Sequence, residues 1–225
     1  MSLLNEASLV QIPSGYKEDK LYSIIPSDGS GDFNFSRAST ATRVNAEGLI
    51  EEMPYNKLQQ SNQFDTTWFN SNSNETGGQS GYDGTNNAWL INKTAASGYI
   101  RQDLPANGVL TLSVYAKKGS LNWIRVIATG GTSTPSTWFD LENGVVGSAD
   151  FFTLSSNIES VGNGYYRCSI TFNVGTINGV RYYPADGNNN VSGTSGSIYI
   201  QDAQVNIGST AKPYFPTTDR LNVPR

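Results

Sequence analysis

Apolar and polar residues alternate with a period of two along much of residues 87–206, the spacing of a β-strand with one buried face. The clearest run covers residues 109–117. One parity of this run is apolar, namely Leu110, Leu112, Val114 and Ala116. The other parity is mostly polar, namely Thr111, Ser113, Tyr115 and Lys117. The pattern predicts that the first set faces a core and the second faces outward, and residues 165–172 repeat it.

Several such segments follow one another, with Gly, Asn, Asp or Pro between most of them. The predicted strands are 88–91, 98–104, 109–116, 121–128, 136–141, 158–161, 165–172, 179–183 and 197–205. Many short strands separated by turn signals indicate an all-β fold, an antiparallel β-sandwich of jelly-roll type. In the last strand Ile198 and Ile200 share a parity with Asp202, which predicts a β-bulge or a buried polar site near Asp202.

The rest of the chain is patterned less regularly. Residues 1–60 hold short apolar patches separated by Pro and Gly, and we predict an extended N-terminal arm or small β-element that docks on another protein. Residues 61–86 are interpreted as a polar connection to the sandwich at 87–206, and residues 207–225 as a C-terminal extension.

The composition of the chain limits the kinds of partner that it is expected to bind. The chain is 37% hydrophobic and carries a net charge of −4 with no basic stripe, which argues against a nucleic-acid partner. We also expect no membrane partner, because no stretch approaches the length of a transmembrane span and the start lacks a signal-peptide pattern. The single cysteine, Cys168, cannot form an internal disulfide and is predicted to be a buried thiol.

Catalytic signatures are scarce in this sequence. The absence of histidine removes Ser-His-Asp and Cys-His arrangements and the commonest zinc ligand. No glycine-rich phosphate loop is present, and no carboxylate pair of the glycosidase kind can be recognised among the 19 acidic residues. We therefore expect neither an enzyme nor a cofactor.

Two aspartates are weak metal candidates. Asp186 opens a run, Asp-Gly-Asn-Asn-Asn, that resembles the start of a calcium loop, but it lacks glycine at the sixth position and has Ser197 at the twelfth. A solvated turn is the favoured interpretation. Asp202 is a candidate ligand of a different ion.

Aromatic and charged residues share parities on three predicted strands. These carbohydrate-binding candidates are Trp123 with Arg125, Trp138 with Asp140, and Arg181 with Tyr183. If the strands belong to one sheet, they form an aromatic and polar surface of the kind that binds sugars. The alternative is that these rings pack against the arm or against a second subunit.

Residues 37–45 and 48–56, in the arm, resemble the N-terminal region of bacteriophage virion fibre and spike proteins. The resemblance continues through residues 139–144, 161–168 and 196–204. It implies that the arm docks on the virion or on another subunit. The candidate docking residues are Phe33, Phe35, Arg37, Arg43, Leu49 and Ile50.

The resemblance implies a structural subunit of a head fibre or spike, less readily of a tail fibre, on the surface of a phage particle. Its implied partners are capsid, portal, neck or tail proteins and further copies of the chain, since such proteins are commonly trimers. A bacterial surface glycan is the implied receptor. Two alternatives stay open: a carbohydrate-binding adhesin module outside a phage, and an accessory domain of a glycan-degrading enzyme.

Overall fold

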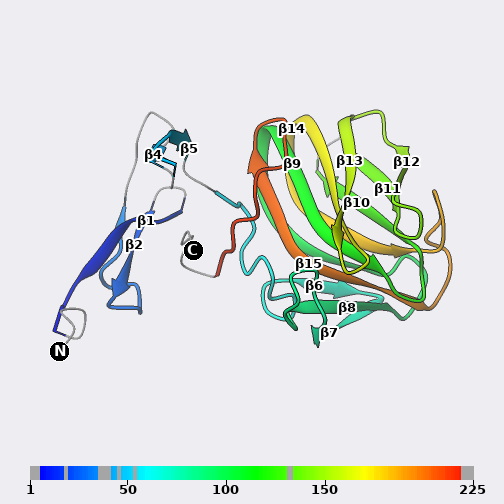
Figure 1. Ribbon diagram of the computed structural model, residues 1–225, viewed down its shortest axis with the longest axis horizontal. Coiled ribbons are helices and arrows are strands. Elements are labelled where there is room, and N and C mark those ends of the chain that lie inside the picture. Colours follow the sequence, from blue (N-terminus) through cyan, green and yellow to red (C-terminus); the bar gives the residue numbers. More distant parts are fainter. Residues whose placement is uncertain are drawn as a thin grey trace.

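The computed structural model describes residues 6–17, 20–34, 42–44, 47–52, 55–130 and 134–218. Every regular element in these ranges is a β-strand, and every strand pair is antiparallel, which confirms the predicted all-β class (Figure 1). The strands are β1 (Val10–Lys17), β2 (Lys20–Ile25), β3 (Phe33–Asn34), β4 (Thr42–Val44), β5 (Ile50–Glu52), β6 (Phe69–Ser71), β7 (Ser73–Gln79), β8 (Ala88–Lys93), β9 (Tyr99–Lys118), β10 (Trp123–Thr129), β11 (Ser136–Asp140), β12 (Val145–Ala149), β13 (Thr153–Gly162), β14 (Tyr165–Ala185) and β15 (Gly196–Ile207).

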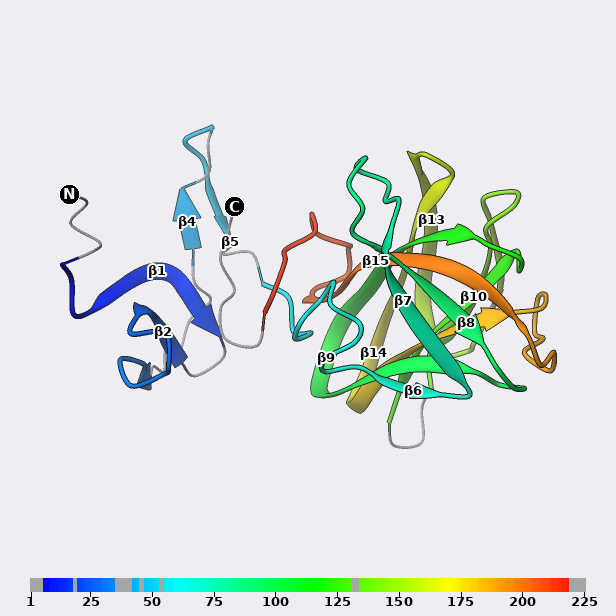
Figure 2. The same ribbon diagram turned by 90° about the horizontal axis from the view of Figure 1, so that it is seen from below.

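Strands β6–β15 form one hydrogen-bonded network that folds into two layers. The first layer has the order β6-β9-β14-β10-β11-β12, and the second has the order β13-β14-β9-β15-β8-β7. Figure 2 shows β15, β8 and β7 side by side in the second layer. The arrangement is sandwich-like, as predicted, and its assignment to the jelly-roll type stays a prediction.

Two long strands, β9 and β14, belong to both layers because each bends midway. The first half of β9 pairs with β6 and with the second half of β14, whereas residues 108–116 pair with the first half of β14. The bend in β9 contains Pro105 and Gly108, and the pairing register of β14 shifts between Val174 and Gly179. The sequence predicted two strands in each case, because Pro and Gly resemble turn signals, but here the chain bends without reversing.

The core lies between the two layers. The predicted inward set of β9, Leu110 to Ala116, is fully buried, and so is Cys168 on β14. Ile124 and Val126 of β10 and Tyr182 of β14 enter the same core from the first layer. Fully burying an aliphatic side chain contributes about 1.5–3 kcal/mol, so this core is a large contribution to the stability of the sandwich.

The predicted outward set of β9 is also largely buried. Thr111 and Ser113 are each 1% exposed and Tyr115 is 8% exposed. The chain after β15 covers this face, because the Thr111 hydroxyl donates to the Gly208 carbonyl at 2.8 Å and the Thr171 hydroxyl donates to the Ser209 carbonyl at 3.2 Å. Residues 208–218 are therefore part of the sandwich, in contrast to the extension predicted for residues 207–225.

The polar connection predicted for residues 61–86 is also corrected, because it contains β6 and β7. Strand β7 reads Ser-Asn-Glu-Thr-Gly-Gly-Gln and has no apolar alternation. It forms the edge of the second layer and is held by backbone pairing to β8, so its side chains do not need to be apolar.

The arm forms two small sheets, β1–β3 and β4–β5, which lie to one side of the sandwich in Figure 1. The arm ends before residue 55, earlier than predicted, because Asn56, Leu58 and Ser61 are fully buried in the sandwich. Phe35 and Arg37 lie outside the described residues.

A β-bulge in β15 joins the start and the end of the sandwich. The register shifts between Gln201 and Gln204, and Asp202 has a φ of 53°, which confirms the predicted bulge. The segment at 56–62 takes the place of a neighbouring strand: the Ala203 amide donates to the Ser61 carbonyl at 2.9 Å, and the Asp202 amide donates to the Asn62 side chain at 3.0 Å.

Asn56 completes this junction. Its side-chain amide donates to the carbonyls of Ala203 at 3.0 Å and Phe215 at 3.1 Å. Its side-chain oxygen accepts from the amides of Leu58 at 3.1 Å and Val205 at 3.0 Å. One buried side chain thus connects the start of the sandwich to two segments that lie 147 and 159 positions further along the chain, and all of its hydrogen-bonding capacity is used.

We predict that Asn56→Ala lowers the free energy of unfolding by about 2–4 kcal/mol, because it leaves buried amides and carbonyls without partners. Urea denaturation of the full chain measures this. Asn157→Ala, at an exposed asparagine of β13, is the matched control and should change stability by less than about 0.5 kcal/mol. Equal stability of the two variants would contradict the role of Asn56.

Candidate functional site

Strand pairing brings the predicted carbohydrate-binding residues onto one sheet face. Arg125 lies opposite Trp138 on β11 and opposite Tyr183 on β14, and Trp123 lies opposite Asp140. Since Ile124 and Val126 point into the core, this set lies on the outer face of the first layer. We call it the arginine–aromatic face, which consists of Tyr99, Trp123, Arg125, Trp138, Arg181 and Tyr183.

Guanidinium groups and rings are interleaved on this face. The Arg125 guanidinium carbon lies 5.1 Å from the Trp138 ring centroid and 5.8 Å from that of Tyr183. The Arg181 guanidinium carbon lies 4.8 Å from the centroid of Tyr99. Trp138 and Tyr183 are only 6% and 7% exposed, so little of either ring is open to a sugar. For these two rings the geometry agrees with the packing alternative.

The two arginines of this face, Arg125 and Arg181, form no ion pair with the described residues. The Nε atom of each is buried without a hydrogen bond. Burial lowers the pKa of Arg125, while the nearby Tyr183 and Asp150 raise it. Arginine stays charged in spite of such a shift, so the face carries positive charge that no ion pair in the described part of the chain neutralises.

Asp140, the acidic residue predicted for this face, is 9% exposed and has a local role. Its carboxylate accepts from the backbone amide of Glu142 at 2.9 Å and from the side-chain amide of Asn143 at 2.8 Å. It therefore stabilises the turn after β11 and is not directed at a ligand.

Asp186, the first calcium candidate, pairs with a lysine. The Lys93 ammonium is fully buried and donates to the Asp186 carboxylate at 2.7 Å and to the Val191 carbonyl at 3.2 Å. The same carboxylate oxygen accepts from the Gly193 amide at 2.9 Å. The ammonium thus supplies the positive charge that a calcium ion would bring to this loop.

Asp202, the other metal candidate, accepts a hydrogen bond from the Tyr82 hydroxyl at 2.9 Å. No group of three or more Cys, Asp or Glu side chains able to hold a metal ion occurs within the described ranges.

The docking candidates that can be placed are exposed. Phe33 is 53% exposed, Leu49 65% and Ile50 78%. Arg43 lies in β4 opposite Glu51, and the structure describes only its backbone. Large apolar side chains this open to solvent, on sheets of two or three strands, form a surface that a partner can cover.

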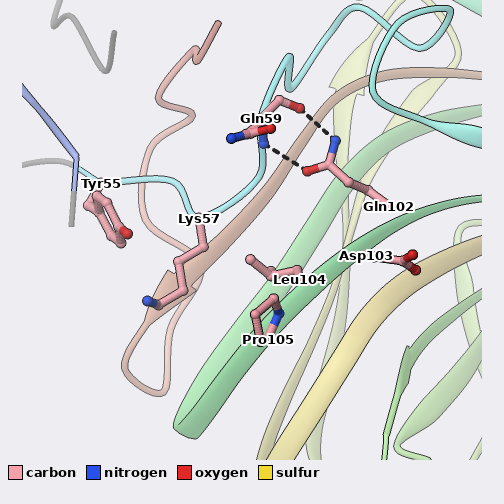
Figure 3. Close-up of a pocket in the computed structure, with 7 residues that line it drawn as sticks. All are labelled: Tyr55, Lys57, Gln59, Gln102, Asp103, Leu104 and Pro105. Carbon is pink, nitrogen blue, oxygen red and sulfur yellow. Dashed lines mark hydrogen bonds between the residues drawn. The ribbon is translucent and has the colours of Figure 1, made fainter. Parts of the chain in front are cut away.

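A pocket of about 280 Å³ lies where the chain enters the sandwich (Figure 3). Gln102 holds one side of it: its side-chain amide donates to the Gln59 carbonyl at 2.7 Å, and its side-chain oxygen accepts from the Gln59 amide at 2.8 Å. Lys57 and Tyr55 line the arm side, and the Lys57 ammonium lies 5.2 Å from the Tyr55 ring centroid. Nothing in the sequence pattern indicated this pocket, because it depends on a pairing between residues 59 and 102.

The outer face of the second layer carries a tyrosine cluster, which consists of Tyr82, Tyr115, Tyr165, Tyr199 and Tyr214. The rings of Tyr82 and Tyr115 are stacked, with centroids 4.1 Å apart and an interplanar angle of 6°. Burial raises the pKa of Tyr82, and the Asp202 carboxylate raises it further. Burial also raises the pKa of Tyr165, with smaller contributions from Tyr199 and Asp83.

Comparison with known proteins gives little beyond this geometry. No protein-family model and no curated protein matches the chain. Among solved structures, the enzymatically active domain of tailspike protein 4 from bacteriophage CBA120 is similar over 68% of this chain, with 13% identity and a TM-score of 0.39. The matched part is 21% of that tailspike chain. Similarity at this level carries no functional argument, so function is inferred from this chain's own residues.

We predict that the buried tyrosines make the sandwich sensitive to alkali. The pKa values of Tyr82, Tyr165 and Tyr182 are raised in the folded state, whereas an unfolded chain ionises its tyrosines near about pH 10. The unfolded state therefore loses protons first, and stability is kept below about pH 10 and falls above it. Phenolate absorbance and circular dichroism, recorded together against pH, measure this.

These three phenols should ionise only as the circular dichroism signal is lost, and their complete ionisation in the folded protein would contradict the prediction. Tyr182→Phe is the matched variant, because the Tyr182 hydroxyl is buried without a hydrogen bond. Removing that hydroxyl should leave stability unchanged or raise it, and should reduce the loss of stability at alkaline pH.

Proposed function

We propose that this chain is a structural subunit of a bacteriophage fibre or spike, in which the arm docks on the particle and the sandwich is presented outward. The observation that carries the proposal is the contrast between the two parts. The sandwich has a core of buried apolar side chains, whereas no apolar side chain described in the arm is buried, and Leu49 and Ile50 are more than half exposed. Sheets of two or three short strands are marginally stable alone, so the arm needs a partner to cover it.

The hydrogen bonds around Asn56 also support the division of the chain into an arm and a sandwich. Asn56 fixes the first residues of the sandwich against β15, so the chain that leads from the arm enters the sandwich at a defined place. The sequence resemblance of residues 37–45 and 48–56 to virion fibre and spike proteins agrees with a docking role for the arm. The proposed role is assembly and presentation without catalysis.

A second candidate function is attachment to acidic bacterial polysaccharide, and the arginine–aromatic face favours it. Arg125 and Arg181 form no ion pair with a described residue, and Trp123 beside them is partly exposed. A sugar carboxylate can pair with a guanidinium while the sugar ring contacts an aromatic side chain.

For the assembly role, we predict that the double substitution Leu49→Asp and Ile50→Asp abolishes incorporation into particles. The free chain should remain folded, because both side chains are exposed in it and no buried contact is lost. The measurement is the amount of the chain in purified particles, with circular dichroism of the free protein beside it. Ile207→Asp, at a side chain that is 60% exposed on the sandwich, is the matched control. Normal incorporation of the double variant would contradict the docking role.

For the attachment role, we predict that Arg181→Gln weakens binding to uronic-acid polysaccharide by roughly tenfold, since a charged hydrogen bond contributes about 1.5–3 kcal/mol. Biolayer interferometry on immobilised polysaccharide measures this. Lys118→Gln removes the same charge at an exposed ion pair with Glu142 and should leave binding unchanged. An equal loss for both variants would indicate a general charge effect and contradict a specific site.

A further inference from the structure

A groove of about 510 Å³ lies beside the junction, on the side formed by the β7–β8 hairpin. Three separate parts of the chain build it: the segment entering the sandwich, the two strands of the hairpin with the loop between them, and the segment leaving the sandwich. The residues that line it are Gln60, Asn62, Gln63, Gly77, Gly78, Asn86, Asn87, Trp89, Tyr214, Pro216, Thr217 and Thr218. Its volume is within the range of sites that bind small ligands.

Hydrogen bonds hold the walls of this groove in place. The Ser61 amide donates to the Thr217 carbonyl at 3.2 Å, which ties the entering segment to the leaving segment. The Asn62 side chain donates to the Asn87 carbonyl at 3.0 Å, and the Trp89 indole nitrogen donates to the Asn62 carbonyl at 3.0 Å. These bonds attach the hairpin to the entering segment, so the groove exists before any ligand binds.

The lining has no charged side chain and is rich in amides. The side chains of Gln60, Asn86 and Asn87 form no hydrogen bond with other described residues, so their donors and acceptors are available. A side-chain amide donates through nitrogen and accepts through oxygen, which matches two neighbouring hydroxyls of a sugar. The lack of charge distinguishes this groove from the arginine–aromatic face.

One aromatic ring of the groove is open to a ligand. Tyr214 is partly exposed, whereas Trp89, which also lines the groove, is only 8% exposed and supports its wall. Gly77 packs against the indole of Trp89, where an added Cβ would lie 3.1 Å from the ring atom Cη2. A larger residue at this position would push the ring or the strand away. Gly78 has a φ of 75° and open space where its side chain would be, so the rim of the groove is free of side-chain bulk there.

An extended peptide fits this place less well than a sugar chain. The neighbouring strand β7 is at the edge of its layer, where a peptide would add as a further strand. The register of β7 shifts between Thr76 and Gln79, however, and this irregularity interrupts the row of backbone groups that such a peptide needs. The lining also lacks an aliphatic pocket to hold a peptide side chain.

We propose that this groove binds a neutral oligosaccharide, with Gln60, Asn86 and Asn87 as its hydrogen-bonding residues and Tyr214 as its aromatic contact. This proposal names the class of ligand that the sandwich binds. Its biological role rests on the proposed function. The groove is separate from the arginine–aromatic face in both position and charge.

The test uses the full chain and a panel of short neutral oligosaccharides of glucose, galactose and N-acetylglucosamine, with uronic-acid oligosaccharides beside them. Asn86→Ala with Asn87→Ala is the main variant, since both residues are exposed and their side chains hold no internal hydrogen bond. We expect it to weaken binding of a neutral oligosaccharide by roughly tenfold and to leave the unfolding temperature unchanged.

Asn157→Ala with Asn173→Ala is the matched control, because it removes two exposed asparagines from β13 and β14 and should leave binding unchanged. Gln60→Asn gives a second measurement, since asparagine tolerates the φ of 45° at this position and only the reach of the amide shortens. Weaker binding of this variant supports the site.

Neutral binding that survives both groove variants overturns the proposal. Binding of acidic sugars alone, or of peptides in place of sugars, overturns it as well, and so does a panel on which nothing binds. Particle incorporation of the Asn86 and Asn87 variant is measured in parallel. Normal incorporation of the unsubstituted chain without any binding of neutral sugars would reject the groove and keep the assembly role, whereas normal incorporation of the Leu49→Asp and Ile50→Asp variant would reject the assembly role and not the groove.

Discussion

The β-bulge in β15 is the feature on which the rest of the structure depends. A bulge leaves backbone groups without partners in the strand ladder, and buried groups of this kind are costly. Here the segment at 56–62 supplies the missing partners, and Asn56 connects it to both β15 and Phe215. The chain therefore enters and leaves the sandwich at one place. This requirement determines where the arm is attached and which segments surround the groove beside the junction.

The path of the chain at this junction also makes the outer faces of the two layers different. Because the leaving segment runs over the second layer, Thr111 and Ser113 are buried by the chain itself. The outer face of the first layer has no such cover from this segment, and its arginines pack on its own rings. A positively charged face and an uncharged amide-lined groove thus arise on one scaffold, and we propose a different class of sugar for each.

The sequence predicted features whose signal is local. The period of two identified the core of β9, and the broken parity at Asp202 identified the bulge, because each depends on neighbouring residues along one strand. It missed features that depend on distant pairing. Strand β7 has no apolar pattern, the Gln102 contact spans 43 positions, and Lys93 meets Asp186 across 93 positions. Shared parity correctly placed Arg125 and Trp138 on one face, but it gave no information about how deeply Trp138 is buried.

The distribution of buried polar groups also bears on how the two parts of the chain work. In the sandwich, buried polar residues such as Asn56, Lys93 and Gln102 have specific partners, and such partners fix one arrangement of the segments they join. In the arm, by contrast, the apolar side chains of Val44 and Ile50 on the two-stranded sheet, and of Leu49 just before β5, are exposed. The sandwich has its own core, and the arm has exposed apolar side chains. This combination is expected where one part of a chain must keep its shape and the other gains its stability from a partner. In the proposed assembly, the arm is therefore the part that gains stability from its partner, and the sandwich is the part whose surfaces are formed beforehand.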